Sequence, residues 1–397
     1  MDIKNRIQDL AGNFYDDVVR MRRHLHAHPE LSMQEHKTAE YIATQLQLMG
    51  IPFKQGVART GLVAQIEGRN PEKRLLALRA DMDALPIFEE NPVDYKSKNP
   101  GIMHACGHDV HMASLLGAAK ILHTLRHQFE GTIRLIFQPS EENYPGGASL
   151  MIKEGVLENP RPAAIFGQHV FPGLPAGKVG IRSGKYMAST DEIYLTVKGK
   201  GGHAATPHMI VDPVLIASHI VVALQQVVSR RAKPSMPTVL SFGRIIGEGR
   251  TNIIPAEVKL EGTIRTFDED WRAQAHEHIR EIATSVARSM GGECHVFIDH
   301  GYPFLVNDQQ LADSFRQWAG EYLGPENVEE LELAMTAEDF AYYSQIVPAC
   351  FYRLGIRNEG KGIVSNLHTS TFDVDEEGLK TGMGLMAFLA IKRLEEQ

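Results

Sequence analysis

Cysteine is scarce in this 397-residue sequence, and long apolar runs are missing. The three cysteines, Cys106, Cys294 and Cys350, are an odd number and lie far apart, which argues against a disulfide framework and favours a reducing cytoplasm. No apolar stretch approaches the roughly 18 residues of a membrane span, and the N-terminus lacks the apolar centre of a signal peptide. Low-complexity tracts, repeats and blocks of like charge are absent as well. With a formal charge of −8, the chain has no evident footprint for nucleic acid or an anionic membrane.

The length is too great for one ordinary core, so we expect two domains or one domain with a large insertion. Short apolar runs rich in Val, Ile, Leu and Phe are typical of buried strands. A helical pattern over residues 108–129 separates two of these runs, and strand, helix, strand in this order favours an α/β sheet with parallel pairs. A further helix is expected at 32–49. The runs that we interpret as strands are GLVAQIEG, RLLALRAD, TIRLIFQPS and AAIFGQHV.

The pattern changes near residue 184. A strand, a helix, two strands, a second helix and a final strand follow, which is the order βαββαβ of ferredoxin-like modules. We therefore expect an α+β domain at 184–296, inserted into a discontinuous domain formed by 1–183 and 297–397. The last part returns to the α/β style, with helices expected at 308–323 and 376–395 and the strand CFYRLGI between them.

Side chains of the kinds that bind divalent metals follow several of the predicted strands. In an open α/β sheet the carboxyl ends of the strands share one edge, where ligands bind, so residues far apart in the sequence can converge there. Zinc accepts thiolate, imidazole and carboxylate ligands together, whereas manganese and cobalt accept imidazoles and carboxylates. The residues concerned are Asp81, Asp83, Cys106, His108, Glu141, Glu142, His169 and His368.

Each of these residues also has an ordinary structural interpretation. A lone cysteine is commonly a small buried hydrophobe, but Cys106 opens the ligand-dense segment Cys-Gly-His-Asp-Val-His. His111, at the end of that segment, is better interpreted as a core or helix-surface histidine. The adjacent Glu141 and Glu142 repel each other unless they are solvated. A metal that took one of them would relieve this repulsion and leave the other as a general base. His169 and His368 are candidate ligands only because each follows an apolar strand.

Six motifs occur along the chain in this order: RADMDALP, HACGHDVHMASLLGAA, FQPSEE, GQHV, GKGGHAATPH and LHTSTFD. Together they resemble the M20 metallopeptidase family. They are most similar to its amidohydrolase branch of N-acyl-amino-acid amidohydrolases, hippurate hydrolases and auxin-conjugate hydrolases. The likeness runs from MRRHLHAHPEL near the N-terminus to the C-terminal helix. It implies a mixed-sheet metallopeptidase domain with helices on both faces, and an inserted ferredoxin-like domain that serves as lid and dimerisation domain.

The resemblance also implies a site for two divalent ions, which would be zinc, manganese, cobalt or nickel. Cys106 would bridge the ions, where other branches have an aspartate, and Glu141 would be the catalytic base. Many relatives have His-x-Asp where this chain has Asp81-Met-Asp83. The ligating histidine is therefore absent, Asp83 would keep a role in orienting a ligand, and the role of Asp81 stays open. The implied metal ligands are Cys106, His108, Glu142, His169 and His368.

In the inserted domain the resemblance assigns roles to three residues. His203, in Gly-Gly-His-Ala-Ala, matches a histidine that reaches into the neighbouring subunit's site and steadies the oxyanion. Asn252 and Arg265 match residues near the substrate carboxylate, which a guanidinium group binds bidentately. From the residues alone, His203 is an ordinary histidine in a glycine-rich turn and Arg265 a solvated or paired arginine.

The function implied is hydrolysis of the amide bond of N-acyl-L-amino acids to a carboxylate and a free amino acid. Glu141 would activate a water that bridges the two ions. The partners would be this small-molecule substrate and a second copy of the chain in a homodimer, or further copies in a tetramer. A dipeptidase, a carboxypeptidase or an N-acetyl-diaminopimelate deacetylase would use the same site. A non-catalytic metal-binding homologue and a dimer that metal only stabilises are remote alternatives, because Glu141 and all five ligands are present.

Overall fold

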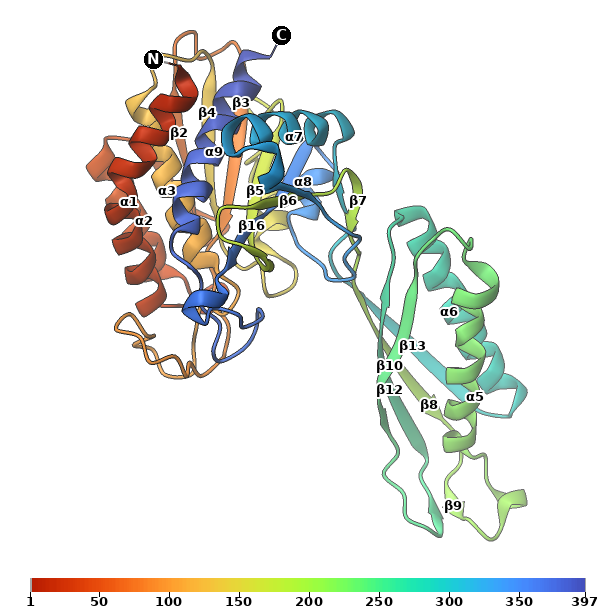
Figure 1. Ribbon diagram of the computed structural model, residues 1–397. Helices are drawn as coiled ribbons and strands as arrows, with labels where there is room; N and C mark the ends of the chain where they lie inside the picture. Colours follow the sequence, from red (N-terminus) through yellow and green to blue (C-terminus); the bar gives the residue numbers. More distant parts are fainter. Residues whose placement is uncertain (1, 397) are drawn as a thin grey trace. The chain divides into compact units, whose positions relative to one another are not determined.

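The computed structural model describes residues 2–396, which form two compact units (Figure 1). The first unit contains the chain up to Tyr186, together with Val306–Leu333 and the segment from Asp339 onwards. The second contains Met187–Leu305 and Ala334–Glu338, so it is inserted into the first along the sequence. A boundary at residue 296, as expected from the sequence, would cut the strand Glu293–His300 in two.

A mixed eight-stranded sheet forms the centre of the first unit. In order across the sheet its strands are β1 (Phe53–Val57), β2 (Gly61–Glu67), β4 (Thr132–Gln138), β3 (Leu75–Asp81), β5 (Ile165–Pro175), β16 (Ala349–Arg357), β6 (Val179–Ile181) and β15 (Val328–Glu330). The central strands β4, β3, β5 and β16 are parallel, whereas β2 and β6 are antiparallel to their inner neighbours. All residues of β3 and β4 are buried, so both faces are covered. The predicted α/β sheet with parallel pairs is confirmed.

Helices α3 (His108–Thr124) and α9 (Gly378–Glu395) are buried nearly all round and pack against each other beside the sheet (Figure 1). A Cβ atom at Gly382 would lie 2.5 Å from Ser114 Oγ, so the glycine permits this close approach. The second helix of the chain begins at His36 rather than at residue 32, because Met33 has a left-handed φ of 62°. The other helices of this unit are α1 (Ile3–Ala27), α2 (His36–Met49), α4 (Gly147–Lys153), α7 (Gln309–Leu323) and α8 (Ala341–Ser344).

The second unit has a four-stranded antiparallel sheet in the order β10-β12-β8-β13, with two helices packed against its core. This is the βαββαβ arrangement predicted from the sequence. Between β10 and β12 the chain forms a short strand, β11 (Ile253–Ile254), which pairs with β9 (Gly202–His203). The main elements are β8 (Asp191–Lys198), α5 (Pro213–Gln226), β10 (Val239–Ile246), β12 (Glu257–Arg265), α6 (Glu269–Ser289) and β13 (Glu293–His300). β7 (Gly184–Met187) and β14 (Leu305–Asn307) form a separate two-stranded sheet.

The segment Pro213–Arg231 corrects one expectation. By length and composition it is long and apolar enough to cross a membrane, with a mean hydropathy of 1.3. The indication is weak, because the core helix of a globular unit passes the same test. Ile216, Ile220 and Leu224 of α5 lie in the core of the second unit.

Candidate metal centre

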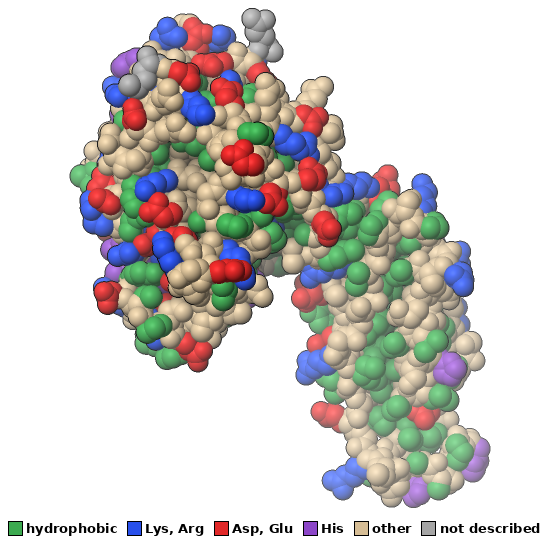
Figure 2. All heavy atoms as spheres, in the orientation of Figure 1, with side chains coloured by type: hydrophobic (Ala, Val, Ile, Leu, Met, Phe, Trp, Pro, Cys, Tyr) green, Lys and Arg blue, Asp and Glu red, His purple; other side chains and the backbone are tan. Residues whose placement is uncertain are grey.

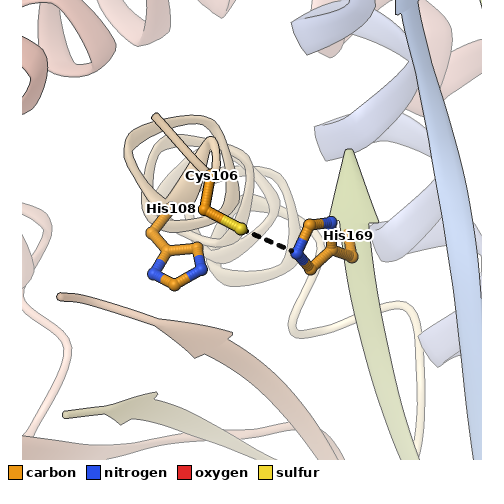
Figure 3. A group of neighbouring side chains, drawn as sticks. All are labelled: Cys106, His108 and His169. Atoms are coloured by element: carbon orange, nitrogen blue, oxygen red, sulfur yellow. Dashed lines mark hydrogen bonds between the residues drawn. The ribbon is translucent and has the colours of Figure 1, made fainter. Parts of the chain in front are cut away.

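The first turn of α3 and the strand β5 bring a cysteine and two histidines together. Cys106 directly precedes the helix, and its Sγ lies 3.4 Å from Nε2 of His169 on β5, with the His108 ring beside it (Figure 3). Gly107 between them has φ of 82°, and a Cβ atom there would lie 2.4 Å from Val170 Cγ2. Glycine is therefore required for the backbone of this turn to approach β5 so closely.

Hydrogen bonds to backbone carbonyl groups orient the two histidine rings. The Nδ1 of His108 donates to the Asp83 carbonyl oxygen at 2.7 Å, and the Nδ1 of His169 donates to the Val170 carbonyl oxygen at 2.7 Å. Both rings therefore direct Nε2 into the site, as metal-ligating histidines commonly do. The Nε2 of His108 is buried and makes no hydrogen bond within residues 2–396.

Glu142 and His368 complete the group from two loops. The Nε2 of His368 lies 3.3 Å from Glu142 Oε1, a buried oxygen that has no hydrogen-bond donor in the described chain. His368 has a left-handed φ of 61°, and its N–H donates to the Ala105 carbonyl oxygen at 2.8 Å, next to Cys106. Such strained backbone is concentrated at functional sites, where surrounding contacts hold it in place.

The potential ligand atoms form two groups that share the cysteine sulfur. In one group, atoms of Cys106, His108 and His169 all lie within 4.8 Å of one another; in the other, atoms of Cys106, Glu142 and His368 do. The structure thus brings all five predicted ligands together. A thiolate common to two groups of three is an arrangement that can bridge two ions.

The electrostatics of the centre also fit divalent cations. Burial raises the pKa of the Cys106 thiol well above its usual value, and the charges of Glu142 and Glu141 raise it further. Burial lowers the pKa of His108, but the carboxylates of Asp81 and Asp83 outweigh burial and raise it to about 10. The centre therefore holds an excess of acidic groups around buried, unpartnered donor atoms. Divalent ions supply the missing positive charge, and they stabilise thiolate over thiol.

Asp83 holds the loop that carries the adjacent glutamates. Its Oδ1 accepts the Glu141 N–H at 2.9 Å and its Oδ2 accepts the Glu142 N–H at 3.0 Å. The Ser32 hydroxyl donates to Oδ2 at 2.6 Å. Asp83 also lies beside the His108 ring. This single carboxylate therefore positions the predicted ligands His108 and Glu142 and the predicted base Glu141. Glu141 itself is buried, and the Asp339 N–H lies 3.4 Å from its Oε1.

Asp81 has a structural partner at each oxygen. Its Oδ2 accepts from Arg79 Nη1 at 2.6 Å, and its Oδ1 accepts from His111 Nδ1 at 2.5 Å. The other nitrogen of His111, Nε2, accepts the Val170 N–H at 2.9 Å, so His111 is a core histidine, as interpreted from the sequence. Asp81 thereby fixes the strand segment next to His169 through His111.

Arg79, Gln138 and Asp339 of this network were not singled out from the sequence. Arg79 donates from Nη2 to Asp339 at 2.8 Å, and Gln138 donates to the same carboxylate at 2.7 Å. The signal was present as an arginine inside the apolar run RLLALRAD and as the acidic pair in AEDF. Asp109, although it adjoins His108, accepts instead from Arg22 at 2.7 Å.

The three residues predicted in the inserted domain lie in the second unit. His203 on β9 is exposed, and its Nδ1 accepts the Ala205 N–H at 3.0 Å. Asn252 lies beside it, since its carbonyl oxygen accepts the Ala204 N–H. Arg265 lies at the other end of β12, on the order of 25 Å away at about 3.3 Å per residue. Asn252 and Arg265 of one copy therefore cannot bind the same carboxylate together.

Comparison with known proteins places this centre in a family. Peptidase family M20/M25/M40 matches residues 77–392. Thermostable carboxypeptidase 2 of Saccharolobus solfataricus is 39% identical over 395 residues, 99% of each chain. N-acyl-L-amino acid amidohydrolase of Geobacillus stearothermophilus is 42% identical over 304 residues, 77% of this chain and 81% of the relative.

A solved structure agrees with these relatives. The YXEP protein of Bacillus subtilis, described as a dinuclear metal binding peptidase from the M20 family, superposes with a TM-score of 0.82 at 34% identity. The match covers 97% of this chain and 99% of that one. The chain is therefore a metal-dependent hydrolase that belongs to peptidase family M20/M25/M40.

Proposed function

We propose that the protein hydrolyses the amide bond of N-acyl-L-amino acids, with Glu141 as the general base. The observation that carries the proposal is the position of Glu141: an oxygen of this buried carboxylate lies within 4.8 Å of ligand atoms of both His108 and Glu142. A base at this distance reaches a water held by the metal centre. The similarity to an N-acyl-L-amino acid amidohydrolase supports the choice of amide.

The five predicted ligands would hold two divalent ions, which supply Lewis-acid activation of water and of the substrate carbonyl. The mixed set of thiolate, imidazole and carboxylate suits zinc, manganese, cobalt or nickel. Glu141 would accept the proton of the attacking water and pass it to the leaving amine. Asp83 would hold Glu141 in place through the backbone hydrogen bond described above.

A homodimer would bring residues of the second unit to the site. We propose that His203 of one copy stabilises the oxyanion in the site of the partner copy, with Asn252 beside it. The Arg265 that binds the substrate carboxylate in that site would belong to a different copy from this Asn252. The separation of Asn252 and Arg265 along β12 supports contributions from two copies. The second unit would thus act as lid and dimerisation domain. Hydrophobic side chains gather on the face of this unit seen in Figure 2 and would offer a contact for a second copy. Val222 of α5 is 74% exposed.

A carboxypeptidase is the second candidate, because a relative that matches 99% of this chain is named as such. The two functions differ in whether the scissile amide joins an acyl group or a peptide to the C-terminal residue. Residues of the acyl pocket would decide between them.

A cytoplasmic location is proposed on the three cysteines, all buried and unpaired.

The test assays wild type and Glu141→Gln with zinc, manganese, cobalt or nickel on acetyl, benzoyl and indole-acetyl amino acids and on dipeptides. We expect the wild type to prefer N-acyl amino acids, and the variant to lose about 100- to 10,000-fold in kcat with its metal content intact. Wild-type turnover by the variant would remove Glu141 from the mechanism. A preference for dipeptides would favour the peptidase function instead.

Mixed dimers test the role of His203. Glu141→Gln and His203→Ala subunits are each expected to be inactive alone. In a mixed dimer one of the two sites combines an intact Glu141 with an intact partner His203, so random mixing should restore about a quarter of wild-type activity. If mixed dimers form, as shown by differently tagged subunits, and no activity returns, the contribution across the interface is wrong.

A further inference from the structure

A pocket of about 470 Å³ lies in the first unit at the edge of its sheet. Its lining comes from residues of β1 and β2, from Arg134 of β4 and from residues of the turn after α4. None of the predicted metal ligands lines this pocket. It is therefore a separate cavity from the metal centre.

Arg134 is a buried cation without a carboxylate partner in residues 2–396. Only 3% of it is exposed, and its Nη1 donates to the carbonyl oxygens of Val156 at 2.6 Å and Glu158 at 3.2 Å. Its Nε is buried and makes no hydrogen bond within the described chain. Burial lowers the pKa of Arg134, and no acidic group offsets this. A charge in this state is costly unless a counter-ion reaches it.

Three other buried arginines of the protein each have the carboxylate partner that Arg134 lacks within the described residues. Arg22 contacts Asp109, Arg79 contacts Asp81 and Arg272 contacts Asp191, each at ion-pair distance. Arg134 alone of these four faces a pocket and has carbonyl oxygens as its only acceptors within the described residues. The comparison indicates that the anion for Arg134 comes from a ligand.

The rest of the lining narrows the chemistry of that ligand. The exposed Lys54 adds a second cation to the lining, and the exposed Glu154 and Glu158 add two carboxylates. These acids disfavour a phosphate or a dicarboxylate, and they favour a ligand that also carries a positive charge. Val57 and Val63 add an apolar surface on the strand side.

We propose that this pocket binds a free amino acid with an apolar side chain. Its carboxylate pairs with Arg134, whose planar guanidinium group binds carboxylates with charge-assisted hydrogen bonds. Its ammonium group lies towards Glu154 and Glu158, and its side chain packs against Val57 and Val63. The proposal stands on this pocket alone and does not depend on the substrate assigned to the metal centre.

Hydrogen–deuterium exchange of the metal-loaded enzyme tests the proposal with three probes of similar shape. Leucine has both charges, leucinamide lacks the carboxylate and 4-methylpentanoate lacks the ammonium group. We expect leucine to slow exchange in residues 52–65 and 154–159. Each of the other probes should need at least about tenfold higher concentration, because a charge-assisted hydrogen bond is lost. Binding at the metal centre would instead protect residues 104–111 and 140–142, so the two sites are distinguished.

Variants decide the roles of the charges. Arg134→Gln should abolish the leucine protection, whereas Arg69→Gln, at an exposed arginine of the same unit, should leave it unchanged. If Arg134→Gln does not fold, the exposed pair Glu154→Gln and Glu158→Gln still tests the pocket, since it should erase the preference for leucine over 4-methylpentanoate. Equal protection by leucine and leucinamide, no protection by leucine in these segments, or an unchanged preference in the paired variant would overturn the proposal.

Discussion

Among the buried charges of the described residues, the Asp191 cluster of the second unit and the metal centre differ in how completely they are paired. In the second unit, Asp191 accepts from Arg272 Nε at 2.8 Å, from His276 Nε2 at 2.7 Å and from the Gly301 N–H at 3.1 Å. In the metal centre, His108 Nε2 and Glu142 Oε1 are buried without hydrogen bonds in the described chain. Native proteins leave few buried polar groups unpaired. The paired cluster therefore indicates a structural role, and the unpaired one a place where something binds.

Removing the shared sulfur should have the largest effect. Cys106→Ala is expected to reduce bound metal from two ions to fewer than one per chain and to lower kcat at least about 1,000-fold, because the metals supply several kcal/mol of transition-state stabilisation. Elemental analysis and kinetics measure the two quantities. Cys294→Ala, a buried cysteine of the second unit, is the matched control and should retain both. Two tightly bound ions in Cys106→Ala would show that the sulfur is not shared.

A change in the Asp191 cluster should lower stability and leave the metal content unchanged. Asp191→Asn removes the buried carboxylate of this pair and leaves Arg272 its ion pair with the more exposed Glu269. We expect the free energy of unfolding to fall by about 3 kcal/mol, the lower end of the usual range for a broken buried pair. The metal content should not change, because the ligands lie in the first unit. Urea unfolding with elemental analysis checks both points, with Asp299→Asn on β13 as the control. A stability loss under 1 kcal/mol would show that the cluster is not structurally important.

His111 lies between these extremes, since it is fully hydrogen-bonded but touches the metal centre through Val170. His111→Asn should weaken metal affinity by about 10- to 100-fold, the usual effect of losing a group that orients ligands. Chelator competition measures this affinity. His123→Asn, at the far end of the same helix, should leave it unchanged. If the His111 variant binds metal as the wild type does, the link from Asp81 to His169 is not functional.

The predicted strand ends indicated which side chains converge, and the family resemblance selected five of them as ligands, but neither indicated what holds these ligands in place. Cys106, His108, Glu142, His169 and His368 follow strands or open a helix, and parallel strands deliver such residues to one edge. No comparable rule predicts from the local sequence which acidic residue pairs with a given arginine. Arg79 pairs with Asp339, 260 positions later, and nothing in the pattern around either residue names the other.

Local backbone geometry was equally difficult to predict. The left-handed residues Met33 and His368 have no glycine signal, and they depend on surrounding contacts. The short strands β6 and β15 have three residues each, which is too few for a periodic pattern. The large distance between Asn252 and Arg265 also follows from the structure, because Arg265 lies at the far end of β12 (Glu257–Arg265). The resemblance gave both residues the same role, but a shared role does not show that two residues lie close together.

Acid titration of the Asp191 cluster gives the smallest effect. Burial raises the pKa of Asp191, but the hydrogen bonds from Arg272 and His276 outweigh it and lower the pKa to about 2. A lowered carboxylate pKa adds stability above the unfolded value near 3.8, and this stability is lost as the pH falls towards 2. Between pH 5 and 3 the guanidinium group of Arg272 keeps its charge, so the difference between the wild type and Asp191→Asn reports on Asp191. The wild type should therefore lose about 1 kcal/mol more than Asp191→Asn over this range. Urea unfolding at each pH measures the difference, and parallel curves for the two proteins would mean that folding does not lower the pKa of Asp191.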